Sequence, residues 1–359
     1  MYALVTGATL RPAATIVEEA PAMGDGSPRR PANDSSRDPT LAGTGEFEVI
    51  RRVVAGLGAF PVAGVPVGPG DDAALVAVRG GTVLATTDLM VEGRHFRRDW
   101  SSATDVGHKV AAANLADVAA MGGVCTALLV GFAGPPDLPT TWAVDLAAGI
   151  AAEAGVLGAR VVGGDTSSAA AVVVAVTALG ELAPGTDPVL RSGARPGNVL
   201  ALRGRLGWAA AGLAALGRGF RSPRLAVTAH RRPEPPYAAG PQAAAAGATA
   251  MIDVSDGLLA DLAHIAGASG VTIEVASGRL PVAEPVATVA AAMNADPLQF
   301  VLTGGDDHAL VATFPAEVEL PTDWTPIGRV LDGDGDPTVT VDGRAPGPVV
   351  RGWDHFGRR

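Results

Sequence analysis

Short apolar segments that end in an acidic residue recur along the whole chain, and this pattern constrains the fold most. The segment "VLATTDLMVEGRHF" (83–96) is strand-like up to Asp88, and "ARVVGGDTSS" (159–168) and "ATAMIDVSDG" (248–257) follow the same plan. Helical segments alternate with these strands, but nothing in their order requires every strand to run parallel. The pattern therefore predicts two α+β domains whose strand ends carry carboxylates.

Two Ala-rich segments of the first half are predicted to be helices. Residues 105–123 contain no proline and end at a glycine pair, which is a typical helix stop. A second helix is expected over residues 142–154. Lys109, the only lysine of the chain, lies in the first helix, where a role beside the acidic motif and a simple bias toward arginine both remain open. Further strands are expected over residues 73–78, 82–87, 172–182 and 200–204.

The length of 359 residues is sufficient for two domains of ordinary size. Residues 1–43 are rich in Pro, Ala, Ser and Arg without periodicity, which predicts a flexible tail. An amphipathic helix over residues 45–57 is expected to begin the folded part. The Pro/Gly-rich segment 183–198 is the best candidate for a domain junction. We therefore expect an amino-terminal domain over 44–183 and a carboxy-terminal domain over 184–359.

Charge and hydropathy exclude several classes of partner. The net charge of -10 disfavours nucleic acid, because binding by counterion release needs a basic face. No window approaches the roughly 18 apolar residues of a membrane span. The amino terminus lacks a basic region ahead of an apolar one, and the single Cys125 cannot form an intrachain disulfide. We expect a cytoplasmic protein without a membrane partner.

Several common catalytic and nucleotide-binding motifs are absent from the sequence. There is no G-x-x-x-x-G-K-[ST] phosphate loop, and no G-x-G-x-x-G follows a strand and opens a helix. The nucleophile motif G-x-S-x-G is also missing. A phosphate loop with a lysine, a Rossmann dinucleotide site and a serine hydrolase are therefore not supported.

Carboxylates at strand ends indicate a metal and polyphosphate site instead. Magnesium prefers oxygen ligands, usually one or two carboxylates together with phosphate oxygens and waters. A glycine before an acid lets backbone N–H groups approach a phosphate. Each Gly-Asp pair alone is an ordinary turn, so the indication comes from their number in both halves. The acids are Asp71, Asp72, Asp88, Asp117, Asp165, Asp253, Asp256, Asp306 and Asp307.

Four segments admit a structural and a functional interpretation. Ser255 or Asp256 is a natural N-cap of the helix that follows, and this role can coexist with ligand binding. His95 suits either a phosphate contact or an ordinary surface histidine. Trp353 suits packing at a domain edge or contact with a flat cationic ring. Residues 332–343 suggest a calcium loop, but its sixth and twelfth positions are wrong, so a hairpin turn is expected there.

The order of the motifs resembles the thiamine-monophosphate kinases, which share a superfamily with aminoimidazole ribonucleotide synthetase and selenophosphate synthetase. The resemblance runs from about Gly45 to Phe356 and rests on many short motifs in one order. They are "GEFEVI", "GPGDDAAL", "TTDLMVEGRHF", "NLADVAAMGG", "VVGGDTS", "RSGARPG", "IDVSDGLLADL", "LTGGDDHAL" and "GWDHF". It implies two α+β domains of the aminoimidazole ribonucleotide synthetase-like type, with amino-terminal domains that form a shared sheet in a homodimer.

The resemblance also implies a reaction, in which ATP and several Mg²⁺ ions convert thiamine monophosphate to thiamine diphosphate. The matching metal positions are Asp72, Thr86, Thr87, Asp88, Asp117, Asp165, Asp253 and Asp256. The matching ATP positions are Gly164, Asp165, Arg191 and Ser255. The matching acceptor positions are His95, Asp306 and Trp353. The acceptor phosphate is already ionised at neutral pH, so direct in-line transfer assisted by metal needs no general base.

Two positions depart from the family pattern, which usually reads "GGEDYEL" where this chain reads "GGDDHAL". Asp306 replaces a longer glutamate, and His308 replaces a tyrosine. Two other functions remain as alternatives: another ATP-using synthetase of the same superfamily, or a nonenzymatic protein that binds magnesium and nucleotide. A panel of acceptors with ATP consumption as the readout separates them.

Overall fold

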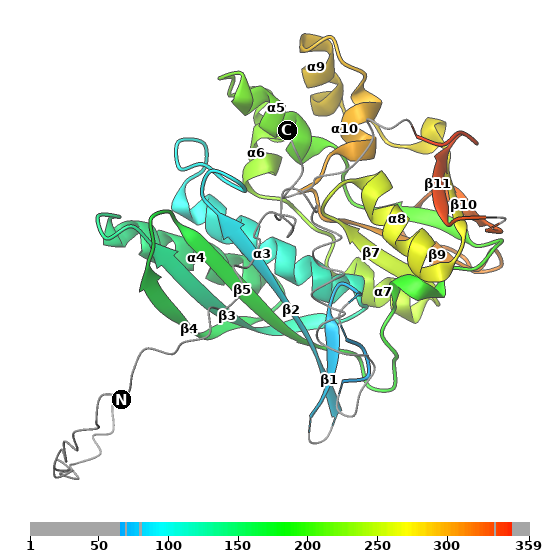
Figure 1. Cartoon of the computed structure of the whole chain (residues 1–359), viewed down its shortest axis with the longest axis horizontal. Coiled ribbons are helices and arrows are strands. Elements are labelled where there is room, and N and C mark those ends of the chain that lie inside the picture. The colour runs from blue at the N-terminus through cyan, green and yellow to red at the C-terminus, as the bar shows by residue number, and fades with distance from the viewer. Residues whose placement is uncertain (1–64, 69, 79–80, 334, 347–359) are drawn as a thin grey trace, which may run out of the picture. The chain divides into compact units, whose positions relative to one another are not determined.

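The computed structural model describes residues 65–68, 70–78, 81–333 and 335–346, which form two β-sheets with their helices (Figure 1). The described residues all belong to one compact unit. The predicted tail over 1–43, the helix expected over 45–57 and the acceptor position Trp353 lie outside the described residues.

The first sheet is mixed, with the strand order β1-β2-β5-β3-β4. Neighbouring strands are antiparallel except β3 and β4, which run parallel. The strand that begins at Arg160 continues through Asp165 to Ser168 before the chain turns. The strands are β1 (Ala74–Val78), β2 (Gly81–Val91), β3 (Val124–Gly134), β4 (Arg160–Ser168) and β5 (Val173–Glu181).

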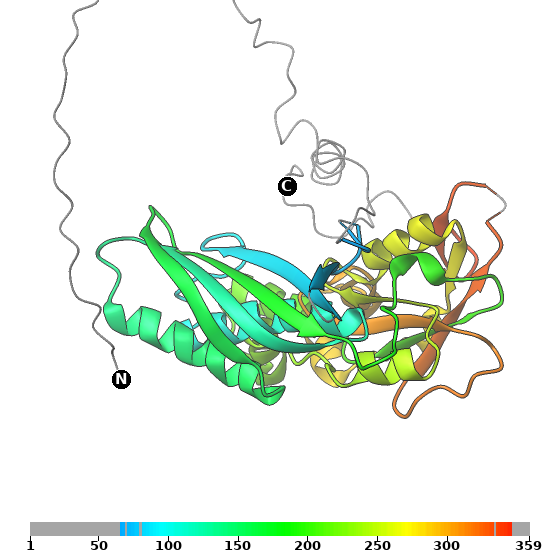
Figure 2. The ribbon, with the colours of Figure 1, turned by 90° about the horizontal axis from the view of Figure 1, so that it is seen from below.

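Helices α3 (Ala103–Ala120) and α4 (Thr140–Val156) confirm the two helices expected in the first half and pack on each other. Figure 2 shows α4 along one face of the first sheet. Side chains alternate along β5, so Val174 and Val176 are buried on the helical side. On the opposite face Leu89 is 54% exposed and Leu129 40% exposed. Among the described residues, helices therefore cover one face of this sheet and leave the other open.

The second sheet is also mixed, with the order β11-β8-β10-β6-β9-β7. Its strands are β6 (Val199–Arg203), β7 (Ala250–Val254), β8 (Thr272–Val275), β9 (Ala309–Phe314), β10 (Thr325–Leu331) and β11 (Thr338–Val341). Its helices are α5 (Trp208–Gly217), α6 (Arg224–Arg231), α7 (Ala239–Ala245), α8 (Leu258–Ser269), α9 (Glu284–Ala292) and α10 (Pro297–Thr303). The short 3₁₀ helices are η1 (Arg191–Gly193) and η2 (Ser277–Arg279).

The hairpin turn expected within residues 332–343 does not join β10 to β11, and the antiparallel turn of this region lies at its end, where Val341 bridges Arg344. Strand β11 does not fold back on β10 but pairs in parallel with β8. Both edges of β10 are already occupied, one by β6 and one by β8. The chain therefore crosses to the remaining edge of β8, where Val339 is buried in the core of the second sheet.

The two sheets meet at helix α3, which contacts β2 and β5 of the first sheet and β7 of the second. Its N-terminus is held by a capping box, in which Ser102 accepts from the N–H of Asp105 and Asp105 accepts from the N–H of Ser102. Fourteen of its residues are buried, as expected for a helix between two sheets. In the part of the chain that the structure describes, every helix is too short or too polar to cross a membrane.

Candidate active site

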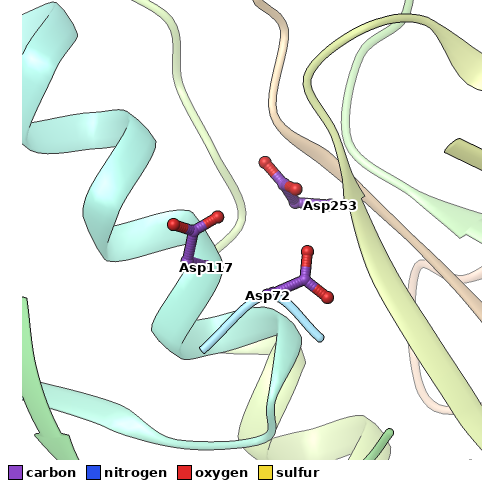
Figure 3. A group of neighbouring side chains, drawn as sticks. All are labelled: Asp72, Asp117 and Asp253. Atoms are coloured by element: carbon purple, nitrogen blue, oxygen red, sulfur yellow. The ribbon is translucent and has the colours of Figure 1, made fainter. Parts of the chain in front are cut away.

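Three carboxylates meet where α3 contacts β7. Asp117 comes from α3, Asp253 from β7, and Asp72 from the turn before β1 (Figure 3). One oxygen of each lies within 4.8 Å of the others. We call Asp72, Asp117 and Asp253 the carboxylate cluster. Two of its members, Asp72 and Asp253, are 181 positions apart in the sequence.

Strand β2 supplies the neighbouring polar groups from alternate residues. The hydroxyl of Thr86 donates to Asp117 Oδ2 at 2.8 Å, and the backbone N–H of Asp88 donates to Asn114 Oδ1 at 3.1 Å. Asn114 is fully buried in α3 and also donates to the Val110 carbonyl at 2.9 Å. Sequence reasoning missed Asn114, although its place in "NLAD", three residues before Asp117, puts it on nearly the same side of the helix.

The raised pKa values of these carboxyl groups show that burial crowds more negative charge into the site than its cations balance. Burial raises the pKa of Asp72 to about 7, with Asp253 adding to the increase and Arg191 opposing it. Burial also raises the pKa of Asp88 to about 6. The pKa of Asp117 lies well above its usual value, because of burial and then of the charges on Asp88 and Asp253. Carboxylate oxygens crowded in this way fit Mg²⁺, which would remove their mutual repulsion.

Arg191, in η1, is the ion-pair partner of Asp72. Its Nη2 donates to Asp72 Oδ1 at 3.0 Å and its Nε to Oδ2 at 3.2 Å. The backbone N–H of Arg191 donates to Asp71 Oδ1 at 2.7 Å. These contacts attach the segment between the two sheets to the turn before β1 and bring a guanidinium group, suited to phosphate recognition, to the carboxylate cluster.

His308 holds Asp253 from the start of β9. Its Nδ1 lies 2.8 Å from Asp253 Oδ2, and both side chains are buried. The buried Nε2 of His308 has no hydrogen-bond partner among the described residues. Burial lowers the pKa of His308, but the hydrogen bond to Asp253 and the charges of Asp253, Asp306 and Asp88 together outweigh it and raise the pKa above its usual value. His308, one of the two residues that depart from the family pattern, is thus in contact with the carboxylate cluster.

The cap expected at Ser255 or Asp256 is wrong. The N-cap position of α8 is Gly257, with φ 121°, and it forms no side-chain cap. Asp261, inside the first turn, instead accepts the N–H groups of Asp256 at 3.1 Å and Gly257 at 3.0 Å. Asp261 thus holds the turn that precedes α8, and the residue at the N-cap position has no side chain that could cap the helix.

Sequence and structure comparisons agree with this architecture. Residues 70–182 match the AIR synthase related protein N-terminal domain, and residues 195–340 match the corresponding C-terminal domain. The thiamine-monophosphate kinase of Mycobacterium tuberculosis is 49% identical over 324 residues, which cover 90% of this chain and 95% of that protein. The chain belongs to the thiamine-monophosphate kinases. The thiamine-monophosphate kinase of Corynebacterium glutamicum is 38% identical, and the match covers 90% of this chain and 97% of that protein.

A solved structure described as AaThiL complexed with AMPPCP and TMP has the same fold. Its TM-score is 0.81 at 32% identity, and the match covers 89% of this chain and 100% of that one. A hydrogenase maturation protein, HypE, is 19% identical with a TM-score of 0.56, so it shares the fold alone. The aminoimidazole ribonucleotide synthetase-like fold expected from the sequence is confirmed for this thiamine-monophosphate kinase.

Three of the positions matched to metal or ATP do not join the carboxylate cluster. Thr87 lies on the other side of β2 from Thr86, and its hydroxyl donates to the Val176 carbonyl at 3.0 Å. Asp88, Val176, Val130 and Gly164 form one row across the first sheet. That row places Gly164 about 14 Å from Asp88, at roughly 4.8 Å per strand. A side chain at Gly164 would overlap the backbone of Val130, so close strand approach already explains this glycine.

Asp165 occupies the next row, with Gly131, Ala175 and Leu89. Its side chain therefore shares the open face of the sheet with the exposed Leu89, opposite the face that carries Asp88. The two remaining matched residues of β7 and its following turn, Ser255 and Asp256, are half-buried beside Asp253. Within one chain, Asp165 and the carboxylate cluster of this kinase lie on different sides of the first sheet.

The described acceptor positions come together at Lys109, in the amino-terminal half of α3. His95 Nδ1 accepts the N–H of Val91 at 2.9 Å, which closes the turn after β2. Its carbonyl lies 3.4 Å from Lys109 Nζ, and the same Nζ lies 2.8 Å from Asp306 Oδ2. The structure thus brings His95 and Asp306 to one place, with Lys109 between them.

Proposed function

We propose that the carboxylate cluster is where this chain transfers the γ-phosphoryl group of ATP to thiamine monophosphate. The chain phosphorylates thiamine monophosphate to thiamine diphosphate, the activity of the family to which it belongs. The observation that carries the location is the meeting of Asp72, Asp117 and Asp253 within 4.8 Å at the junction of the two sheets.

Mg²⁺ ions held by these carboxylates would neutralise the charge of two phosphate groups and align them for in-line transfer. The residues around the cluster keep its oxygens in place. Thr86 fixes the Asp117 carboxylate by a hydrogen bond, and His308 fixes that of Asp253. Asp88, anchored to α3 through its N–H, presents a further carboxylate from β2. Preorganised oxygens of this kind need no rearrangement during the reaction.

No group that removes a proton is required. The acceptor is a phosphate monoester, whose second pKa near 6 leaves it mostly ionised at neutral pH. The obstacle is instead repulsion between two anions, which charge neutralisation and positioning overcome. Arg191, already at the cluster, and Ser255 beside Asp253 are the residues we assign to ATP.

The test is direct detection of thiamine diphosphate by mass spectrometry after incubation with ATP, thiamine monophosphate and Mg²⁺. We expect product only when Mg²⁺ is present, and loss of at least about 100-fold in Asp253→Asn, which keeps the shape but not the charge. Asp145→Asn is the matched control, because this acid is exposed on α4. Normal turnover by Asp253→Asn would place the metal site elsewhere.

The same assay separates the alternatives. ATP consumption with another acceptor but not with thiamine monophosphate would indicate a different synthetase of the superfamily. Binding of Mg²⁺ and ATP without turnover of any acceptor would indicate a nonenzymatic nucleotide-binding protein. Both outcomes contradict the proposed reaction rather than its location.

The family resemblance implies a homodimer with a shared sheet, and we also propose that the open face of the first sheet lies at the contact between the two copies. Leu89 and Leu129 expose apolar surface on this face, and Asp165 lies there as well. A second copy would cover the apolar residues and bring its Asp165 toward a partner. Light scattering should give the mass of a dimer, and Leu129→Glu should shift it toward the monomer. A monomeric parent chain would contradict the pairing.

The domain limits and the location in the cell stay proposals. The match to the N-terminal family domain ends at residue 182, and the match to the C-terminal family domain begins at residue 195. This gap supports a junction between 183 and 198 and the division into 44–183 and 184–359. The flexible tail over 1–43 and a cytoplasmic location are predictions from the sequence alone.

A further inference from the structure

Helix α3 and strand β2 run in opposite directions and are joined by side-chain hydrogen bonds along their length. Two contacts join them, Thr86 with Asp117 and Asp88 with Asn114, and a third follows in the same order from the turn after β2, where the His95 carbonyl contacts Lys109. The first contact lies at the carboxylate cluster. The last lies eight residues away along the helix, or about 12 Å at a rise of 1.5 Å per residue. A phosphate between the two ends would thus have carboxylates on one side and Lys109 on the other.

The same order appears on the facing side, in the second sheet. Asp253 belongs to the carboxylate cluster, His308 is bonded to Asp253, and Asp306 pairs with Lys109. Backbone hydrogen bonds hold this segment, from the N–H of Asp306 to the Ser255 carbonyl at 2.8 Å and from that of His308 to the Val254 carbonyl at 3.0 Å. The ion pair therefore ends a row of polar groups that begins at the cluster.

The two members of the ion pair differ in exposure. The Lys109 side chain is only 3% exposed, whereas that of Asp306 is 42% exposed. Burial raises the pKa of Asp306, but Lys109 and then His230 outweigh it and bring the pKa to about 2. Asp306 is therefore ionised at neutral pH and reachable by a ligand, while the ammonium lies behind it. Asp306 also adopts φ 66°, a conformation that is uncommon for a residue other than glycine.

The acceptor carries two opposite charges, a thiazolium cation and a phosphate that a two-carbon chain separates. We propose that the Lys109–Asp306 pair recognises both charges, with the Asp306 carboxylate facing the thiazolium and the Lys109 ammonium binding the phosphate. This inference rests on the proposed function and adds Lys109 to it. An ammonium has three donors, of which Asp306 and the His95 carbonyl engage two.

A purely structural role for the pair predicts different behaviour. If the pair only held the two sheets together, removing one partner would leave the other charge unpaired, destabilise the fold and weaken every ligand together. A recognition role makes each charge specific for one part of the acceptor. The geometry favours recognition because the carboxylate is open to solvent and because the pair lies in line with the carboxylate cluster.

The experiment measures binding of three probes by calorimetry in the presence of Mg²⁺ and a nonhydrolysable ATP analogue. The probes are thiamine monophosphate, thiamine without the phosphate, and 4-methyl-5-(2-phosphooxyethyl)thiazole without the cationic ring. For Lys109→Gln we expect affinity for the two phosphate-bearing probes to fall about tenfold, with thiamine unchanged. For Asp306→Asn we expect the two cationic probes to weaken, with the neutral thiazole phosphate unchanged. Affinity for the ATP analogue should not change in either variant.

A single substitution can unfold the chain by leaving one charge buried without a partner. The double variant Lys109→Gln/Asp306→Asn keeps a neutral hydrogen-bonded pair and decides the question in that case. We expect it to fold and to lose both preferences, for the phosphate and for the cation. Equal weakening of all three probes, or unchanged preferences in the double variant, would overturn the proposal.

Failure of this inference can be told from failure of the proposed function. If the parent chain makes thiamine diphosphate and the preferences do not follow the two charges, only the role of the ion pair is wrong. If the parent chain makes no thiamine diphosphate, the proposed function itself fails. Lys109→Arg adds a further readout, because it keeps the charge and should restore the preference for phosphate.

Discussion

The backbone N–H of Asp88 donates a hydrogen bond to the side chain of Asn114 at 3.1 Å, so β2 is fixed to α3 beside the carboxylate that enters the site. Asn114 is fully buried and uses its amide nitrogen for the Val110 carbonyl of its own helix. A buried amide with both ends bonded has one orientation. The position of Asp88 is therefore set by the helix that also carries Asp117.

We predict that Asp88→Asn folds but loses nearly all phosphoryl transfer. The amide keeps the size of the side chain and leaves the backbone bond to Asn114 intact, while it removes the charge that would hold Mg²⁺. Turnover should fall by at least about 100-fold, with an unchanged melting temperature. Near-normal turnover at limiting Mg²⁺ would show that this strand end does not bind the metal.

Asp261→Ala should loosen the turn that carries Asp256. The substitution removes the acceptor of two N–H groups, those of Asp256 and Gly257, at a cost of about 1–3 kcal/mol in unfolding free energy. Asp261→Asn is the matched control, since its amide oxygen can still accept both bonds. Chemical denaturation checks the difference, and equal losses in the two variants would rule out the hydrogen bonds as the cause.

Gly149→Ala should destabilise the contact between α3 and α4. A side chain at Gly149 would overlap the backbone of Thr104, just as one at Gly107 would overlap that of Leu146. Overpacking of this kind costs about 1–3 kcal/mol. The control is Gly155→Ala on the same helix, where the added carbon meets open space. Thermal unfolding should separate the two variants, with Gly155→Ala equal to the parent or slightly more stable.

The lowered pKa of the buried His230 predicts that the folded protein loses stability as the solution becomes acidic. Burial, followed by the charge of Lys109, lowers its pKa to about 3, with Arg231 acting in the same direction and Asp306 opposing them. The unfolded chain binds the proton near pH 6.5 and the folded chain does not, so stability falls as the pH drops below 6.5. Between pH 6.5 and 5 this group contributes a loss of about 2 kcal/mol, at 1.36 kcal/mol per pH unit.

His230→Leu should remove that part of the acid sensitivity. The comparison is the change in unfolding free energy from pH 7 to pH 5 in the parent and in the variant, with each protein serving as its own reference. Because His230 also contacts Trp100, the variant can differ in absolute stability at pH 7. Equal pH slopes in the two proteins would show that His230 takes up its proton in the folded state.

Local sequence patterns were sufficient for much of the fold. The apolar runs of β2, β5 and β7 and the Ala-rich α3 and α4 depend on residues close in the chain, and all five elements appear as expected. Carboxylates were expected at strand ends because an apolar run stops there, and Asp88 and Asp253 do lie near the ends of β2 and β7. The family followed from the order of the motifs, which is a property of the sequence alone.

Other features depend on where distant segments meet. Strand β11 joins β8 because both edges of β10 are occupied, and that occupancy is not visible in residues 332–343. Asp165 looks like the other acids in sequence, yet the strand order places it on the open face of the first sheet. Side-chain alternation fixes the face only once the pairing of the strand is known.

The Lys109–Asp306 pair is the clearest case. The sequence shows a single lysine and an acid beside two glycines, and neither pattern indicates that the other exists. Only the packing of α3 against the second sheet brings their charges to 2.8 Å across 197 residues. The sequence by itself determined which groups the site can use, since chemistry belongs to residue types. Their grouping was decided by the tertiary structure, because burial and sheet order act between segments that carry no local record of each other.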